Sequence, residues 1–159
     1  MDRQAIERLY REYGPTVYRR ACNILRSEDD AREAMQDVFV TALTKGNTFQ
    51  GTSTVMTWLY SVTTHLCLNR IRYGKRRAEL MQGFDPESWT TATPHPELVQ
   101  TIHSVLRSVP EKLAEVAVYY YLDDMTHDEI AKIMGCSRRK VGYLLDKFRE
   151  QVTKKEDSE

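Results

Sequence analysis

Apolar residues recur at helical spacing along most of the chain. Ile6, Leu9, Tyr10 and Tyr13 fall at positions i, i+3, i+4 and i+7, and the spacing returns after Pro15. This pattern predicts two amphipathic helices, one on each side of the proline. The same spacing predicts further helices, over about 28–43, 54–75, 98–106, 110–120, 126–134 and 137–152. No segment alternates between apolar and polar residues for long enough to predict a strand, so the expected fold is all-α.

The helical spacing fails between Lys75 and Glu97. The stretch MQGFDPESWTTATPHPE holds one glycine and three prolines among polar residues, which is a linker composition. We therefore expect two small helical domains, residues 1–77 and 97–159, joined by a flexible linker over 78–96.

Capping residues near the C-terminus outline a helix-turn-helix. Thr126 and Glu129 have the spacing of a capping box, Gly135 is placed to end that helix, and Ser137 can begin the next. The exposed start of the second helix would then carry Arg138, Arg139, Lys140 and Tyr143, where groove and phosphate contacts are made. The same caps would also serve two helices that merely pack in a bundle.

The helix predicted from about Thr54 has an unusual polar side. Its apolar stripe is Val55, Leu59, Val62 and Leu66. A helical wheel at about 100° per residue places a tryptophan with polar side chains on the other side. These residues are Trp58, Ser61, His65, Asn69 and Arg72. The ring of Trp58 could stack on an unpaired base, or it could simply cover the protein core.

Composition narrows the function classes. The 159 residues are 41% hydrophobic and carry 23 basic and 23 acidic side chains, and no apolar run is long enough to span a membrane. The N-terminal residues lack the pattern of a signal peptide, so a cytoplasmic location is expected. The three cysteines and four histidines have no metal-ligand spacing, and no phosphate-binding loop or catalytic motif is present. We expect no metal, no cofactor, no catalytic residue and no enzymatic activity.

Three segments carry a family resemblance that covers nearly the whole chain. DAREAMQDVFVTA at 30–42 and FQGTSTVMTWLYSVTTHLCLNRIR at 49–72 resemble region 2 of extracytoplasmic-function (group 4) RNA polymerase sigma factors of the sigma-70 family. VPEKLAEVAVYYYLDDMTHDEIAKIMGCSRRKV at 109–141 resembles their region 4. The resemblance implies a factor that binds core RNA polymerase, through the β′ clamp helices and the β flap, and directs it to promoter DNA. It also implies an anti-sigma factor as a further partner, and no insertion into a membrane.

The resemblance assigns three groups of residues. The polymerase-binding group is Glu33, Gln36 and Asp37. The group for the promoter −10 element is Phe49, Gln50, Gly51, Trp58, His65, Asn69 and Arg72. The group for the −35 element is Arg138, Arg139, Lys140, Tyr143 and Lys147.

Two departures from the family pattern affect these assignments. Val141 is followed by Gly142, Tyr143 and Leu144 rather than by alternating basic and serine residues, so a promoter consensus does not transfer. Because glycine inside a helix costs about 1 kcal/mol relative to alanine, we expect Gly142 to mark a close approach to another group. Residues 61–65 also lack two basic residues common in the family, which predicts low affinity of the free protein for duplex DNA.

Two other function classes stay open at this stage. A stand-alone helix-turn-helix regulator would explain residues 126–150 and leave the N-terminal half without a role. A polymerase-binding regulator without promoter recognition is the second alternative. Initiation from a promoter would distinguish the sigma factor from both.

Overall fold

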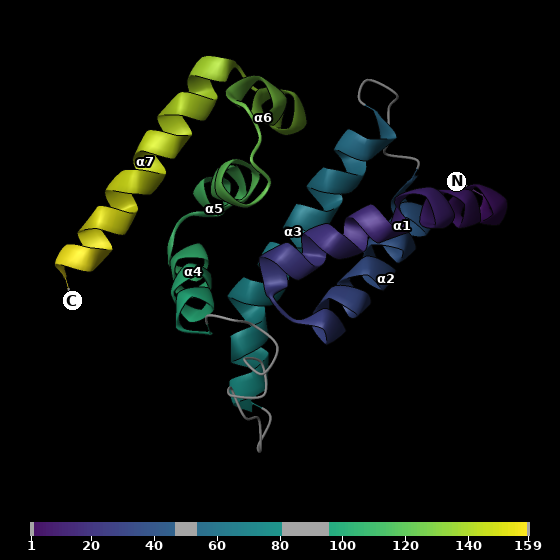
Figure 1. Cartoon of the computed structure of the whole chain (residues 1–159), viewed down its shortest axis with the longest axis horizontal. Coiled ribbons are helices and arrows are strands. Elements are labelled where there is room, and N and C mark those ends of the chain that lie inside the picture. The colour runs from purple at the N-terminus through teal and green to yellow at the C-terminus, as the bar shows by residue number, and fades with distance from the viewer. Residues whose placement is uncertain (1, 47–53, 81–95, 159) are drawn as a thin grey trace.

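The regular structure is helical throughout residues 2–46, 54–80 and 96–158, the parts of the chain that the computed structural model describes. In chain order the elements are α1 (Arg3–Leu25), α2 (Glu28–Lys45), α3 (Val55–Leu80), α4 (Pro96–Ser108), α5 (Glu111–Ala117), the π-helical turn η3 (Val118–Leu122), α6 (His127–Met134) and α7 (Arg138–Asp157). The prediction of an all-α fold is confirmed (Figure 1).

The prediction of two helices separated by Pro15 is wrong, because α1 runs unbroken through the proline. Pro15 cannot donate a backbone hydrogen bond to the preceding turn. It lies on the exposed side of the helix, where water can replace that bond, while Val17, Ala21 and Ile24 bury the opposite side. Packing of this buried side keeps the helix continuous.

Helices α1, α2 and α3 pack against one another in the N-terminal half. Ser27 caps α2 by accepting a hydrogen bond from the Asp30 backbone N–H at 3.3 Å, as its sequence position predicts. The buried face of α2 consists of Ala31, Ala34, Val38, Phe39 and Ala42. Leu43 has the spacing of a core residue, yet it is 47% exposed.

The apolar stripe predicted for α3 is only partly correct. Leu59 is buried, but Val62 and Leu66 are half-buried. The fully covered positions are Thr63, Thr64, Cys67, Leu68 and Ile71. The reason is that α3 is packed from more than one side, by α1 and α2 and also by helices of the C-terminal half.

The C-terminal half contains the predicted helix-turn-helix. Thr126 and Glu129 form the reciprocal capping box at the start of α6, and Gly135 ends that helix with a left-handed φ of 66°. Ser137 then caps α7 through the backbone N–H of Lys140. The buried side chains Ile130 and Val141 join the two helices to the core.

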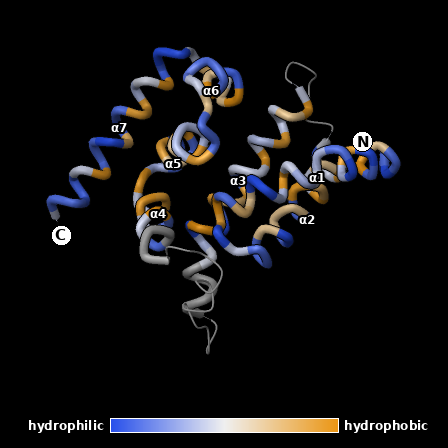
Figure 2. Tube along the Cα trace, viewed as in Figure 1, coloured by the Kyte–Doolittle hydropathy of each residue, from blue (hydrophilic) through white to orange (hydrophobic). Residues whose placement is uncertain are grey.

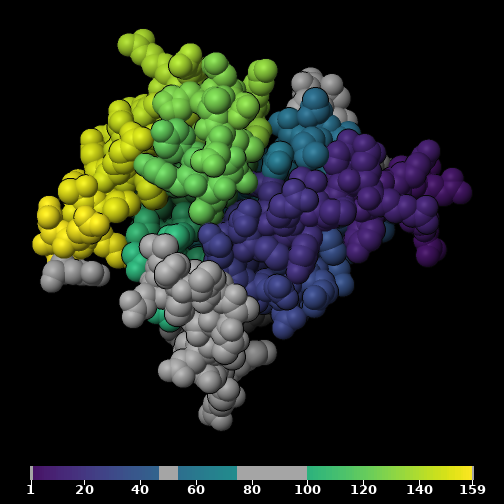
Figure 3. All heavy atoms as spheres, viewed as in Figure 1, coloured from purple at the N-terminus to yellow at the C-terminus, as the bar shows by residue number. Residues whose placement is uncertain are grey.

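The two halves share one hydrophobic cluster. It joins Ile24, Leu68 and Ile71 of the N-terminal half to Leu106 and Tyr119 of the C-terminal half, among others. The C-terminal half lies directly against the N-terminal half in Figure 3, and α3 runs alongside both in Figure 1. Most of the predicted linker, 81–95, lies outside the described residues, and the domain boundaries at 77 and 97 stay predictions.

The described residues contain neither a membrane-spanning helix nor a cluster of potential metal ligands. None of their helices combines the length and apolar character that crossing a bilayer requires. Within the same residues, no three His, Cys, Asp or Glu side chains are grouped so that they could hold a metal ion.

Candidate functional site

The exposed face of α2 carries the three side chains assigned to polymerase binding. Gln36 is exposed, whereas Glu33 and Asp37 both form ion pairs with Arg70 of α3. Arg70 donates to Glu33 Oε2 at 3.1 Å and to Asp37 Oδ2 at 2.7 Å. Because one guanidinium bridges both carboxylates, their positions on the surface are fixed relative to α3.

Two apolar residues of α2 extend this face and were missed by reasoning from sequence. Val40 is 57% exposed and follows Gln36 by one helical turn, and Leu43 lies nearly one further turn along. Polar groups beside exposed apolar ones are typical of protein-binding surfaces. The helical period places Val40 next to Gln36, but it cannot show that Leu43 faces outward.

The seven residues assigned to the −10 element are not all brought together. Phe49, Gln50 and Gly51 lie outside the described residues. Trp58 is half-buried against the cluster formed by Val17, Val38, Phe39 and Leu59, and Asn69 is exposed. Trp58 therefore contributes to the core with part of its ring, as the simpler of the two interpretations expected.

His65 and Arg72 contact the C-terminal half. His65 Nε2 lies 3.3 Å from Oε1 of the buried Glu115, and the hydrogen bond between them raises the pKa of His65. Arg72 donates to the backbone carbonyls of Leu106 at 2.9 Å and Val109 at 2.6 Å. The side of α3 that the wheel predicts to be polar is thus partly covered by protein.

The start of α7 presents the basic cluster predicted from sequence. Arg138, Arg139, Lys140 and Tyr143 are exposed, and Lys147 is partly exposed one turn beyond Tyr143. The Nζ atoms of Lys140 and Lys147 lie 5.3 and 5.5 Å from the centre of the Tyr143 ring. Figure 2 shows that most of α7 is hydrophilic, with apolar residues at intervals. The helix therefore offers positive charge and an aromatic ring on a single surface.

The expectation that Gly142 marks a close approach is wrong within the described chain. A Cβ atom built on Gly142 would have no heavy atom within 4 Å. The position is open because the buried side of α7 is formed by Val141, Leu144 and Leu145.

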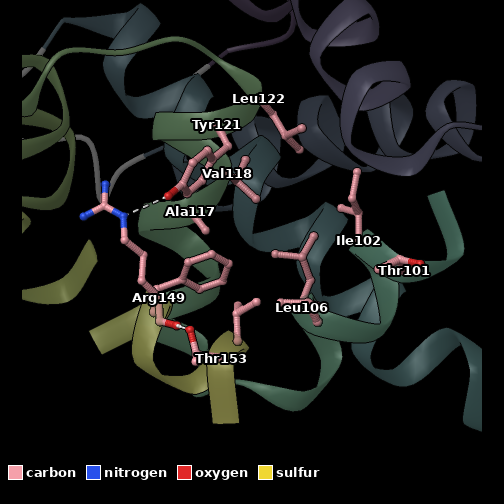
Figure 4. A pocket seen from close by; sticks show the side chains of 12 residues that line it. Thr101, Ile102, Leu106, Ala117, Val118, Tyr121, Leu122, Arg149 and Thr153 are labelled. Atoms are coloured by element: carbon pink, nitrogen blue, oxygen red, sulfur yellow. Dashed lines mark hydrogen bonds between the residues drawn. The ribbon is translucent and has the colours of Figure 1, made fainter. Parts of the chain in front are cut away.

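An apolar cavity of about 680 Å³ lies between α4, α5, η3 and α7. Ile102, Leu106, Val118 and Phe148 line it, and the Tyr121 hydroxyl accepts a hydrogen bond from Arg149 Nε at 3.2 Å at its edge (Figure 4). No signal in the sequence indicates this cavity, because its lining residues have the spacing of ordinary core positions.

Two family models match this chain in the same order as its two halves. The model for sigma-70 region 2 matches residues 9–77, and the model for sigma-70 region 4 matches residues 100–151. The chain belongs to the sigma-70 family. It is an extracytoplasmic-function sigma factor, a class of protein that binds core RNA polymerase and directs it to promoters. Sigma factors as a family are not enzymes.

Similar proteins support this assignment over most of their length. The RNA polymerase sigma factor YlaC of Bacillus subtilis is 27% identical, over 96% of this chain and 92% of YlaC. The extracytoplasmic-function sigma factor SigW of the same organism is 25% identical, over 96% of this chain and 89% of SigW.

Two solved structures share the fold of this sigma factor. Sigma factor RpoE of Bartonella quintana, in complex with the anti-sigma factor NepR, has a TM-score of 0.56 at 16% identity, covering 95% of this chain and 96% of that one. CnrH, in complex with the cytosolic domain of CnrY, has a TM-score of 0.57 at 17% identity, covering 99% and 91%.

Proposed function

We propose that separate surfaces of this sigma factor bind core RNA polymerase and promoter DNA. The face of α2 formed by Gln36, Asp37 and Val40 docks on core RNA polymerase. The basic start of α7 enters the major groove at the −35 element, and α3 contributes to recognition of the −10 element. The region-2 half, 1–77, and the region-4 half, 97–159, are the domains that carry these roles.

The cluster at the start of α7 carries this proposal. Arg138, Arg139 and Lys140 stand at the N-terminal end of the second helix of a helix-turn-helix, the part of the motif that meets base edges. Their exposure leaves the guanidinium and ammonium groups accessible to bases and phosphates. Helix α7 packs on the rest of the protein through its buried side, which does not include these three residues.

The polymerase-binding role is supported by the composition of the α2 face. Gln36 and Asp37 provide polar specificity, while Val40 provides apolar area that gains free energy when water is removed. The surface stays exposed although the two halves of the chain are in contact. It can therefore meet polymerase without a rearrangement of the fold.

The apolar cavity suits a further protein contact. Its lining offers room for an apolar side chain of a partner, and we assign it to the β flap of polymerase. The solved structure of RpoE in complex with the anti-sigma factor NepR supports an anti-sigma factor as a second partner of this protein. The protein would act in the cytoplasm, where polymerase and promoter DNA are, and without catalytic chemistry of its own.

A reciprocal comparison tests this division of surfaces. Variants of Gln36 and Asp37 should lose affinity for core polymerase while the assembled holoenzyme keeps its promoter preference. A variant of Arg139 should keep its affinity for core polymerase and lose promoter binding. Loss of both properties in either variant would show that the surfaces are not separate.

A further inference from the structure

Tyr143 lies on the side of α7 that faces away from the protein core. The buried side of this helix is formed by Val141, Leu144 and Leu145. At about 100° per residue, position 143 lies nearly opposite the centre of that buried side, and the residue is 53% exposed. Arg139 precedes Tyr143 by four residues and therefore shares its face of the helix. The ring thus belongs to the surface that the proposed function places in the major groove.

Tyr143 is the single large apolar side chain that α7 exposes, in a helix whose residues are all described by the structure. The other exposed residues in the first three turns are charged, namely Arg138, Arg139, Lys140 and Asp146. An apolar contact between this face and a partner must therefore be made by the Tyr143 ring.

Two lysines hold the ring from its two sides along the helix. The Nζ atoms of Lys140 and Lys147 both lie within 6 Å of the ring centre, where the cation–π attraction is effective. The seven residues between them span about 10.5 Å along the helix axis. Because the major groove is about 12 Å wide, the two ammonium groups can reach phosphates on its two sides while the ring between them lies over base edges.

Gly142 leaves space beside the ring. A Cβ atom built at this position would have no heavy atom within 4 Å. Since glycine has no side chain, nothing at position 142 keeps the helix away from the floor of a groove. The neighbouring ring of Tyr143 can therefore approach the base edges closely.

The chemistry of the major groove limits what an aromatic ring can recognise there. The base edges present hydrogen-bond donors and acceptors, and the apolar exception is the C5-methyl group of thymine. Contact between this methyl group and an exposed ring removes apolar surface from water on both sides. Cytosine carries only a hydrogen atom at C5, so it gives no equivalent contact.

We propose that Tyr143 recognises one thymine of the −35 element through its C5-methyl group. The inference deepens the proposed function and rests on it, because it requires α7 to lie in the major groove. Lys140 and Lys147 hold the ring and bind phosphates, and Arg139 contacts a neighbouring base or phosphate. The contact uses positions 142 and 143, where the sequence departs from the family pattern, so it gives this protein a base preference of its own.

Replacing single thymines by deoxyuridine tests the contact, because this change removes the C5-methyl group and keeps every hydrogen-bonding group of the base. The DNA is a promoter fragment mapped by transcription with this protein, with each −35 thymine replaced in turn. Fluorescence anisotropy measures its affinity for holoenzyme. One replacement should weaken binding by wild-type holoenzyme about fourfold, as expected for the loss of one buried methyl group.

Three variants separate the ring from other contributions. Tyr143→Ala should bind the thymine and deoxyuridine fragments almost equally, whereas Tyr143→Phe keeps the ring and should keep the fourfold difference. Tyr10→Ala is the matched control, because it removes a ring of 46% exposure from α1, and it should also keep the difference. Each variant is compared with itself on two fragments, so a general loss of stability or of polymerase binding does not change the ratio.

Several results would overturn the proposal. They are a −35 element without thymine, an unchanged affinity of wild type at every replaced thymine, and an equal loss for wild type and Tyr143→Ala. Loss of the difference in Tyr143→Phe would assign the contact to the hydroxyl group and overturn the role of the ring. If the proposed function itself fails, holoenzyme shows no preference for the promoter fragment over DNA of random sequence, whereas failure of this inference alone leaves that preference intact.

Discussion

At the scale of single residues, the assigned side chains fall into two groups. Some are exposed, and others are engaged, which means that they already contact another part of the protein. Gln36, Arg139 and Tyr143 are exposed and need no rearrangement to meet a partner. His65 and Arg72 already have partners in the C-terminal half. A substitution at an exposed position should therefore change binding with little effect on stability, whereas one at an engaged position changes both.

The α2 face gives the first prediction. Gln36→Ala combined with Asp37→Ala should weaken binding to core polymerase at least tenfold, or about 1.4 kcal/mol, because exposed interface groups are lost. Arg70 keeps its contact with Glu33, so the melting temperature should barely change. A titration of labelled protein with purified core enzyme measures the affinity. Glu7→Ala, at an exposed position on α1, is the control, and an unchanged affinity of the double variant would refute the assignment.

Arg139 gives the second prediction. Arg139→Ala should reduce binding of holoenzyme to a cognate promoter by about 1–3 kcal/mol if the guanidinium reads a base edge. A promoter library with a randomised −35 element should then show relaxed preference at one position. Lys154→Ala, at an exposed position near the other end of α7, should change neither quantity. If Arg139→Ala behaves like Lys154→Ala, the docking orientation of α7 is wrong.

At the scale of elements, local chemistry and long-range packing contribute differently. Ser27, Thr126, Gly135 and Ser137 end or begin helices where the sequence predicts, because a cap depends only on groups within a few residues. The continuity of α1 through Pro15 depends on packing instead. The buried face of α3 depends on helices on more than one side of it, and this information is not contained in the periodicity of α3 itself.

The two glycines of the helix-turn-helix give the third prediction. Gly142→Ala should stabilise the protein by up to about 1 kcal/mol, because alanine favours a helix interior and the site has open space. Gly135→Ala should destabilise it, since φ is positive there. Thermal unfolding measures both. A destabilised Gly142→Ala would show that this position is crowded. Reduced promoter binding by a stabilised Gly142→Ala would place Gly142 against DNA.

At the scale of the whole molecule, the contact between the halves was not predictable from sequence. Arg20 shares the helical spacing of the buried residues Val17, Ala21 and Ile24, but nothing near it in the chain indicates that its partner is Asp123. The family resemblance gave the order of the two regions and the exposed groups on α2 and α7. It could not show that His65 and Arg72 contact the second half of their own chain.

Two histidines between the halves give the fourth prediction. The stability that depends on each of them changes with pH in opposite directions. The bond to Glu115 raises the pKa of His65, so its stabilising effect is present below about pH 6.5 and is lost as pH rises through the folded-state pKa. Burial lowers the pKa of His103, so the folded state loses stability as pH falls below about 6.5. Urea unfolding between pH 5 and 8 measures the free energy.

Glutamine variants separate the two effects. His65→Gln should cost stability mainly at the acid end of the range, and the cost should shrink as pH rises. His103→Gln should make the protein less sensitive to acid than wild type. Parallel pH profiles for wild type and both variants would contradict the pKa shifts and the contacts that cause them.

Reconstituted run-off transcription tests most directly whether this protein directs core RNA polymerase to specific promoters. Purified core RNA polymerase and genomic DNA fragments are incubated with this protein, and transcript starts are mapped. We expect discrete start sites that require the protein, disappear with Gln36→Ala and Asp37→Ala combined, and weaken with Arg139→Ala while core binding is kept. Binding of the protein to DNA fragments without polymerase, with no new start sites when polymerase is added, would contradict this role and favour a stand-alone helix-turn-helix regulator.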